Sequence, residues 1–229
     1  MTSGVQALFT RVAPRYDLLN RLFSLGRDVL WRRAAAALLN PSVPGPLLDL
    51  ACGTIDLSLD LARRYPDRQV IGCDFNREML KLGLTKLGRS GIGSVDLVCG
   101  NGLELPFDQG LFAGAAIAFG IRNFPDRPAG LADLHRVLAP GGRLAVLELG
   151  APKGRLASLY LPYLLKLMPL LARLAGAEPE DYAYLGRSIM GFPGSKEFVG
   201  MMDKAGFRSR VLPLNRGIVN LYLGLKPGG

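Results

Sequence analysis

The chain has very little of the chemistry on which metal sites and disulfides depend. Its 229 residues include one histidine, His135, and three cysteines that lie far apart without any CxxC spacing. Metal sites draw on clusters of these two residue types, and an odd number of scattered thiols is not a disulfide framework. We therefore predict no metal site, and we expect Cys52, Cys73 and Cys99 to be buried free thiols in a reducing cytoplasm.

Long apolar runs are also missing. No stretch approaches the roughly eighteen uncharged apolar residues that a membrane-spanning helix requires, and residues 1–15 contain no apolar core of a secretory signal. The formal net charge is nevertheless +9, which suits an anionic membrane surface or a plain solvated surface rich in arginine. Nucleic acid is disfavoured as a partner, because basic residues are not interleaved with aromatic ones and no RNA-binding motif is present.

Apolar residues make up 49% of the chain, and from residue 46 onward short apolar runs alternate with longer helical patterns. The predicted strands are 47–50, 69–74, 95–99, 112–119 and 143–148, with helices at 54–64, 77–87 and 128–138. This alternation predicts a single α/β domain with a parallel sheet covered on both faces, which binds ligands at the carboxyl edge of its strands. After a helix at 196–205, strands at 207–212 and 218–225 predict an antiparallel pair at one edge of the sheet.

A loop of small residues joins the first strand to the first helix, in the segment Asp49-Leu50-Ala51-Cys52-Gly53-Thr54-Ile55-Asp56. Such a loop lets a ligand approach the backbone closely. Asp74 ends the second strand, where a carboxylate can accept both hydroxyls of a ribose. Dinucleotide enzymes share this acidic residue, but their fingerprint requires three glycines around a pyrophosphate. The single Gly53 between Asp49 and Asp56 suits a cationic amino-acid group better.

At Asp49–Thr54 the chain resembles the class I S-adenosylmethionine (SAM)-dependent methyltransferases, and more closely the quinone-biosynthesis C-methyltransferases. The other matching stretches are 16–20 with 24–32 (Y-D-x-x-N, S-x-G and W), 100–107, 117–124 (I-A-F-G-I-R-N-F) and 136–144 (R-V-L-x-P-G-G-x-L). The resemblance implies a Rossmann-like, doubly wound and mostly parallel sheet with one antiparallel edge strand. It also implies one domain over 1–229, with a helical substrate cap at 1–45 and a helical lid at 151–195.

The resemblance assigns a set of residues to the cofactor, SAM. These residues are Asp49, Gly53, Thr54, Asp74, Asn101, Gly102 and Ala118. Three positions depart from the family pattern: Ile55 replaces a glycine, Ala118 a serine and Asp28 a histidine. A β-branched residue does not easily adopt positive φ. We therefore expect either an ordinary backbone conformation at Ile55 or a side chain that narrows the methionine pocket and weakens SAM binding.

The methyl acceptor that the resemblance implies is the ring carbon of a prenylated quinol, a weak nucleophile that becomes stronger when a neighbouring hydroxyl loses its proton. Arg122 is then the stabiliser of the resulting oxyanion, and Asn123 a neutral hydrogen-bonding group. Asp17, or Tyr16 in its ionised form, is the expected proton acceptor. The alternative for Arg122 is a salt bridge to Asp126, four residues further along the chain.

Other interpretations remain open at this stage. The basic, apolar segment 156–175 fits a lid resting on anionic lipid at the inner face of the membrane, or an ordinary buried helix pair. A methyltransferase acting on another phenol, a sterol or an amine would share the cofactor motifs, and a homodimer is a further open partner. Ile55 and Ala118 also allow a scaffold with weakened cofactor binding, and the charge allows an RNA methyltransferase.

Overall fold

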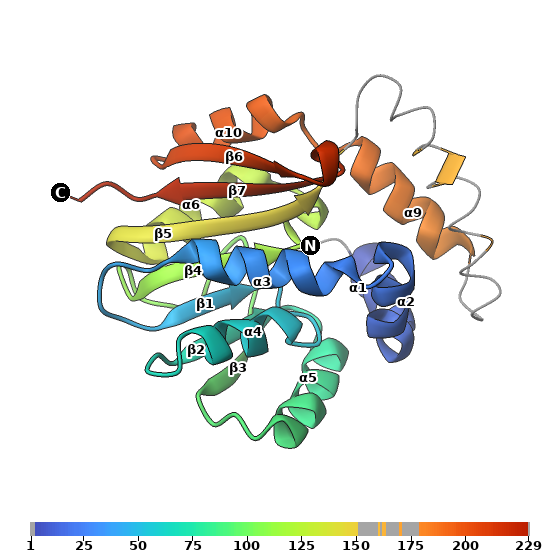
Figure 1. Ribbon diagram of the computed structural model, residues 1–229, viewed down its shortest axis with the longest axis horizontal. Coiled ribbons are helices and arrows are strands. Elements are labelled where there is room, and N and C mark those ends of the chain that lie inside the picture. Colours follow the sequence, from blue (N-terminus) through green and yellow to red (C-terminus); the bar gives the residue numbers. More distant parts are fainter. Residues whose placement is uncertain (1–2, 151–159, 161, 164–169, 171–178, 229) are drawn as a thin grey trace.

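The computed structural model describes residues 3–150, 160, 162–163, 170 and 179–228, and it is a three-layer α/β/α domain (Figure 1). The strands are β1 (Leu47–Leu50), β2 (Val70–Asp74), β3 (Val95–Cys99), β4 (Phe112–Ala118), β5 (Leu138–Leu149), β6 (Arg208–Leu214) and β7 (Val219–Leu225). The α-helices are α1 (Ser3–Val12), α2 (Tyr16–Ser24), α3 (Arg27–Leu39), α4 (Asp56–Arg64), α5 (Arg77–Ser90), α6 (Arg127–Val137), α9 (Pro179–Met190) and α10 (Ser195–Lys204). Short 3-10 helices are η1 (Ala13–Arg15), η2 (Ile121–Asn123) and η4 (Asn215–Gly217).

The seven strands form one sheet in the order β3-β2-β1-β4-β5-β7-β6. The first five strands along the chain pair in parallel, as predicted from the strand–helix alternation. β7 is antiparallel to both β5 and β6, so the predicted antiparallel pair is confirmed, with β6 in the outermost position. Chain order reverses between β1 and β4, and this switch point is where ligands of open α/β sheets bind.

Strand β5 is longer than predicted. The predicted strand covered residues 143–148, but β5 also includes Pro140, Gly141 and Gly142. The Gly141 N–H donates to the Lys226 carbonyl at 3.0 Å, and the Lys226 N–H donates to the Gly142 carbonyl at 2.9 Å. The residues that follow β7 therefore extend the pairing, and Gly141 accommodates the irregular path with a φ of +79°.

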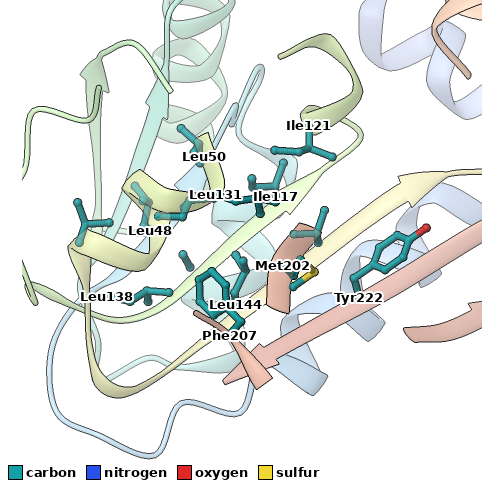
Figure 2. Close-up of a cluster of buried hydrophobic side chains, with 14 of the residues drawn as sticks. Leu48, Leu50, Ile117, Ile121, Leu131, Leu138, Leu144, Met202, Phe207 and Tyr222 are labelled. Carbon is teal, nitrogen blue, oxygen red and sulfur yellow. The ribbon is translucent and has the colours of Figure 1, made fainter. Parts of the chain in front are cut away.

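Both faces of the sheet are buried, which explains the nearly continuous apolar runs of its strands. On one face, side chains of β1, β4, β5 and β7 pack against α6 and α10, and Figure 2 shows this cluster with Leu48, Ile117, Leu131, Met202 and Tyr222. On the other face, α3 and α4 cover the sheet. These two apolar layers hold the strand ends, and hence the loops that follow them, in fixed positions.

The amino-terminal helices divide between two tasks. Ala35, Ala36 and Leu39 of α3 are buried on the sheet, and Leu39 lies so close to Gly114 that a Cβ there would meet its side chain at 3.2 Å. Helix α3 therefore belongs to the helical layer on the sheet, and a substrate cap over residues 1–45 stays a prediction. Figure 1 shows α1 and α2 beyond the carboxyl end of β5, together with α9. Of the predicted lid at 151–195, the positions 151–159, 161, 164–169 and 171–178 lie outside the described residues.

The thiols only partly follow the prediction. Cys52 and Cys73 are buried and free, but Cys99 is free and exposed, because it lies on the edge strand β3. His135 packs edge-on against Phe207, as expected of a packing residue. Among the described residues, no helix is long and apolar enough to cross a membrane, and no group of three His, Cys, Asp or Glu side chains is placed to hold a metal ion.

Candidate active site

Three adjoining cavities lie at the carboxyl ends of β1, β2 and β4. The first and second share Ala51, Asp74 and Phe75, and the second and third share Phe9 and Tyr16. The first is otherwise lined mainly by Gly100, Asn101, Gly102 and Phe124, the second by Gly53, Met79, Ala118 and Asn123, and the third by Leu19, Asn20, Phe23, Arg122, Tyr184 and Leu185. Most of the predicted site residues are thus brought together in three neighbouring cavities that share wall residues.

Asp74 is the carboxylate at the centre of the first two cavities. Its Oδ2 accepts the Gly53 N–H at 2.9 Å, and its Oδ1 accepts the Asn76 N–H at 2.8 Å. Burial raises the pKa of Asp74, and the N–H groups of Asn76 and Gly53 act in the opposite direction. Each carboxylate oxygen keeps a second lone pair, so Asp74 can still accept from two neighbouring hydroxyl donors.

The loop after β1 adopts an unusual backbone conformation. Ala51, Gly53 and Ile55 all have positive φ, with values of +56°, +53° and +68°. The prediction of an ordinary conformation at Ile55 is therefore wrong, and the loop accepts a conformation that costs a β-branched residue about 1–3 kcal/mol.

The side chain of Ile55 does not narrow the cofactor pocket. It is fully buried with Cys52, Leu59 and Leu80, and it lines none of the three cavities. Gly83 of α5 makes this placement feasible, because a Cβ there would lie 2.8 Å from Ile55 Cγ2. The expectation of a narrowed methionine pocket is wrong as well, since the isoleucine points under α5.

Asp49 lies behind the cavity wall. Its Oδ2 accepts the Ser58 hydroxyl at 2.5 Å, while Oδ1 is buried without a partner among the described residues. Burial raises the pKa of Asp49 to about 7, although the Ser58 hydroxyl lowers it. An unpartnered carboxylate oxygen beside the loop fits a cationic group as its missing partner.

Thr54 and Asp56 face away from the cavities, contrary to expectation for the loop. Asp56 pairs with Arg32 at 2.8 Å and with Lys86 at 2.7 Å, so it does not await a cationic ligand group. The Thr54 hydroxyl donates to Asp17 at 2.5 Å and accepts from Lys86 at 3.2 Å. Both side chains serve an ion cluster that ties the loop to α3 and α5.

Asp17 belongs to the same cluster. Its carboxylate lies 2.6 Å from the Lys86 ammonium, and its side chain is not among those lining the three cavities. The side chain thus fastens α2 to the cofactor loop. An additional role as proton acceptor stays a prediction, for which the carboxylate would have to leave Lys86 and Thr54.

Asp28, which stands where the family has a histidine, is a buried member of an ion network. It accepts from Ser24 at 2.7 Å, and it pairs with Arg32 at 2.9 Å and Arg21 at 3.4 Å. Burial opposes ionisation, but the Ser24 hydroxyl and Arg32 together lower the pKa of Asp28. The carboxylate therefore holds α2 against α3. Trp31 packs edge-on against Phe119.

Arg122 is held in η2 by the buried Glu148 at the end of β5. Its Nη1 lies 2.8 Å from Glu148 Oε1 and also donates to the Phe119 carbonyl, and its backbone N–H donates to Glu148 Oε2 at 3.1 Å. The predicted alternative partner, Asp126, instead caps α6 by accepting the Ala129 N–H. Arg122 is 8% exposed and lines the third cavity, so it offers a positioned guanidinium to a ligand there.

Asn123 and two tyrosines complete the wall between the second and third cavities. The Tyr184 hydroxyl donates to Asn123 Oδ1 at 3.0 Å. Burial raises the pKa of Tyr16 above its ordinary value, and Arg122 lowers it only in part. Burial thus favours the protonated form, in which Tyr16 can donate a hydrogen bond, and its predicted role as proton acceptor in the ionised form stays a prediction.

Comparisons with known proteins identify the family. A model described as the ubiE/COQ5 methyltransferase family matches residues 1–226. A demethylmenaquinone methyltransferase of Thermus thermophilus is 42% identical over 221 residues, covering 96% of this chain and 100% of that protein. This chain belongs to the ubiE/COQ5 methyltransferase family. A demethylmenaquinone methyltransferase of Deinococcus radiodurans is 40% identical to this family member, covering 97% of this chain and 92% of that protein.

Solved structures share the fold of this ubiE/COQ5 family member at low sequence identity. A SAM-dependent methyltransferase from Aquifex aeolicus superposes with a TM-score of 0.67 and 16% identity, covering 92% of this chain and 97% of that chain. A phosphoethanolamine N-methyltransferase from Haemonchus contortus, solved with SAM, gives 0.64 and 14%, covering 86% of this chain and 52% of that chain. These likenesses confirm the predicted class I methyltransferase fold.

Sequence reasoning missed several residues of this ubiE/COQ5 site. Phe75 and Met79 line the cavities after β2, and Tyr184 comes from α9. The position of Phe75, directly after the acidic strand end, was a usable signal for a ring beside the ribose site. Lys86 and Glu148 gave no such signal, because their partners lie far away in the sequence.

Proposed function

We propose that this protein transfers the methyl group of SAM to a ring carbon of demethylmenaquinol. The observation that carries the proposal is the adjacency of the three cavities, which share wall residues from Asp74 to Tyr16 and so lead toward Arg122. The cavities around Asp74 lie next to a largely apolar cavity that Arg122 also lines. The two relatives named demethylmenaquinone methyltransferase support this acceptor.

The residues of the first two cavities fit SAM. Asp74 is placed for the ribose hydroxyls, and the Asn101 side chain and Gly102 backbone line the cavity that would receive the adenine. Gly102 and Gly120 must stay small, because a Cβ at either would lie 2.6 Å from Phe124 or Ala51. When bound, SAM supplies an electrophilic methyl group on a sulfonium.

Arg122 is the group that makes the acceptor carbon reactive. A guanidinium beside a quinol hydroxyl stabilises the anion, so the proton leaves more readily and negative charge spreads onto the neighbouring ring carbon. No carboxylate or imidazole lines the third cavity among the described residues, so the proton acceptor must come from outside that lining, as a water molecule or as Asp17 released from Lys86 and Thr54. As the carbon–methyl bond forms, the methyl–sulfur bond would break and S-adenosylhomocysteine would leave. The same ring carbon then loses its hydrogen as a proton and the neighbouring oxygen regains one, so that the ring becomes aromatic again with one net proton released.

The cover of the third cavity comes from α1, α2 and α9. Leu19 and Phe23 of α2 and Leu185 of α9 provide apolar walls, and Tyr163 donates its hydroxyl to the Phe23 carbonyl at 2.8 Å. Such a cover excludes water from the methyl-transfer step and provides apolar surface for a prenyl tail. We assign the cap to residues 3–24 and part of the lid to α9.

The test is a methylation assay with purified protein and SAM carrying a labelled methyl group. We expect label in menaquinol when demethylmenaquinol is supplied under reducing conditions, and none when the oxidised demethylmenaquinone is supplied, because the quinone ring carbon is not nucleophilic. A demethylated benzoquinol and a sterol serve as competing acceptors. Binding of SAM without transfer to demethylmenaquinol would refute the proposed acceptor, and absence of SAM binding would favour the scaffold interpretation.

We also propose that the protein contacts an anionic membrane through the outer face of α2. Leu18 and Leu22 are 63% and 42% exposed and form an apolar stripe one helical turn apart, and Leu25, directly after the end of α2, is 84% exposed. The opposite face of the same helix lines the third cavity. A stripe that enters the lipid would bring the cavity close to a substrate dissolved in the bilayer.

The homodimer stays a prediction. Light scattering tests it by measuring whether the molar mass of the protein in solution is that of one chain or of two.

Replacing Leu18 and Leu22 with serine is expected to lower turnover of vesicle-embedded substrate several-fold, because the apolar area available to the bilayer falls. Turnover of a short-chain substrate in solution should stay unchanged. The matched control is Leu84→Ser with Leu111→Ser, two exposed leucines outside α2. Equal losses in both variants would contradict the assignment of the membrane face to α2.

A further inference from the structure

A fourth hollow lies outside the cavities of the methyl-transfer site, among α2, α3, α4 and α5. Its volume is about 360 Å³, within the range of small-molecule sites. The charged side chains that line it are Arg21, Arg32, Arg33, Asp56, Asp60, Arg63, Lys86 and Arg89. Six basic groups thus surround the hollow, against two carboxylates. Nothing in the proposed methyl transfer uses this concentration of positive charge.

The positive charge is not fully neutralised from within the protein. Asp17 and Asp28 contact Lys86 and Arg32 from outside the lining, and counting them raises the carboxylates to four against six cations. Asp60 is only loosely paired, at 3.9 Å from Arg33 and 3.6 Å from Arg63. At least two positive charges therefore remain in excess around one concave surface.

Two arginines show where additional acceptors are missing. Arg32 is 6% exposed, and its Nε is buried without a hydrogen-bond acceptor among the described residues. Arg89 is exposed and forms no ion pair within the described part of the chain. A buried guanidinium that is only partly satisfied is costly in a protein that has no ligand for it.

We propose that this hollow binds a phosphate-bearing anion with at least two negative charges. Guanidinium groups match phosphate oxygens in pairs of parallel hydrogen bonds, and five of them line this hollow from four helices. A singly charged carboxylate would leave part of the excess charge unbalanced. The volume admits a ligand larger than inorganic phosphate, so the phosphate is that of a small diphosphate or of a phospholipid headgroup.

The variants for the test remove charge without touching the ion cluster of the cofactor loop. Lys86 and Arg32 are unsuitable, because they also hold Asp17 and Asp56. Arg33 and Arg63 are 66% and 56% exposed, and Arg89 is exposed, so the triple variant Arg33→Gln/Arg63→Gln/Arg89→Gln should fold. The matched control removes three exposed charges from α10 and β6: Lys204→Gln/Arg208→Gln/Arg210→Gln.

The first arm is calorimetric titration with sodium pyrophosphate at low ionic strength. We expect the wild type and the control to bind, and the triple variant to bind about tenfold more weakly or worse, because three screened charge contacts are lost. Melting curves establish that all three proteins are folded. Pyrophosphate binding that is lost only in the triple variant identifies a free phosphate compound as the ligand class.

The second arm is sedimentation with phosphatidylglycerol vesicles, with phosphatidylcholine vesicles as the neutral reference. Loss of phosphatidylglycerol binding in the triple variant alone, without any pyrophosphate binding, identifies a lipid headgroup instead. If neither pyrophosphate nor anionic vesicles distinguish the triple variant from the control, the site does not exist. That failure would leave the proposed methyl transfer untouched, because none of the three substituted residues lines the methyl-transfer cavities.

Discussion

Replacing Arg122 with alanine is expected to lower kcat by about 10²- to 10³-fold while the affinity for SAM stays close to that of the wild type. The guanidinium lines the acceptor cavity but neither of the cavities assigned to SAM. Its Nη2 donates to no protein group among the described residues and is not buried, so it is available to a substrate oxygen, whereas its Nε is buried without a partner. Turnover of demethylmenaquinol and calorimetric binding of SAM, measured on the same preparation, test both halves of this prediction.

The fold must be controlled separately, because Arg122→Ala leaves Glu148 as a fully buried, unpaired carboxylate. Removing one partner of such a pair costs about 3–5 kcal/mol of stability. The double variant Arg122→Ala/Glu148→Gln removes both charges, and we expect it to melt closer to the wild type yet remain inactive. Arg122→Lys keeps the positive charge without the planar guanidinium fork, and its turnover should lie between that of the wild type and that of Arg122→Ala. A folded double variant with wild-type turnover would overturn the role of Arg122.

The largest effect on cofactor binding is expected at Asp74. We predict that Asp74→Asn weakens SAM binding by about 10- to 100-fold, in line with the roughly 1.5–3 kcal/mol that hydrogen bonds to a charged group contribute. The carboxylate accepts from Gly53 and Asn76 on one side and faces both cofactor cavities on the other. An amide has only one acceptor oxygen, and its NH₂ group would face an N–H donor. Isothermal titration with SAM measures the loss.

The pH dependence of SAM binding separates the charge of Asp74 from its shape. Burial raises the pKa of Asp74, and the ionised form is the better acceptor for ribose hydroxyls. As the pH falls through this raised pKa, the carboxyl becomes protonated and wild-type affinity should decline, whereas Asp74→Asn should lack that decline. Asp67→Asn, at an exposed turn, is the control. Equal pH profiles for the wild type and Asp74→Asn would show that Asp74 does not contact the cofactor.

Features that depend on neighbouring residues in the chain were predictable. The alternation of apolar runs with helical patterns follows from backbone periodicity, and it predicted the five parallel strands and the final antiparallel pair. Because parallel strands end on the same edge, Gly53, Asp74 and Asn101 were expected to meet, and they do. The family resemblance supplied Arg122 and Asn123, whose short loop folds back beside the cofactor loop.

Features that depend on distant partners were not predictable. Thr54, Asp56 and Asp17 were assigned to ligand or proton chemistry, but Lys86 lies on a later helix and gathers all three. Glu148, 26 residues beyond Arg122, and not the nearby Asp126, orients the guanidinium. Charge pairing is set by which helices pack together, and no local pattern carries that information.

The sequence by itself determined the layered α/β architecture, the sheet edge where the cavities lie and the acidic residue at the end of β2 that lines them. Only the tertiary structure decided which loop side chains face the cavities. Ile55 shows the reason: its positive φ is tolerated because its side chain enters a space that Gly83 of α5 leaves open. The same packing turns Asp56 and Thr54 toward Lys86, whereas Gly53 and Asp74 line the cavity assigned to the cofactor. A side chain of the loop can point either toward the neighbouring helices or into the cavity, but not in both directions.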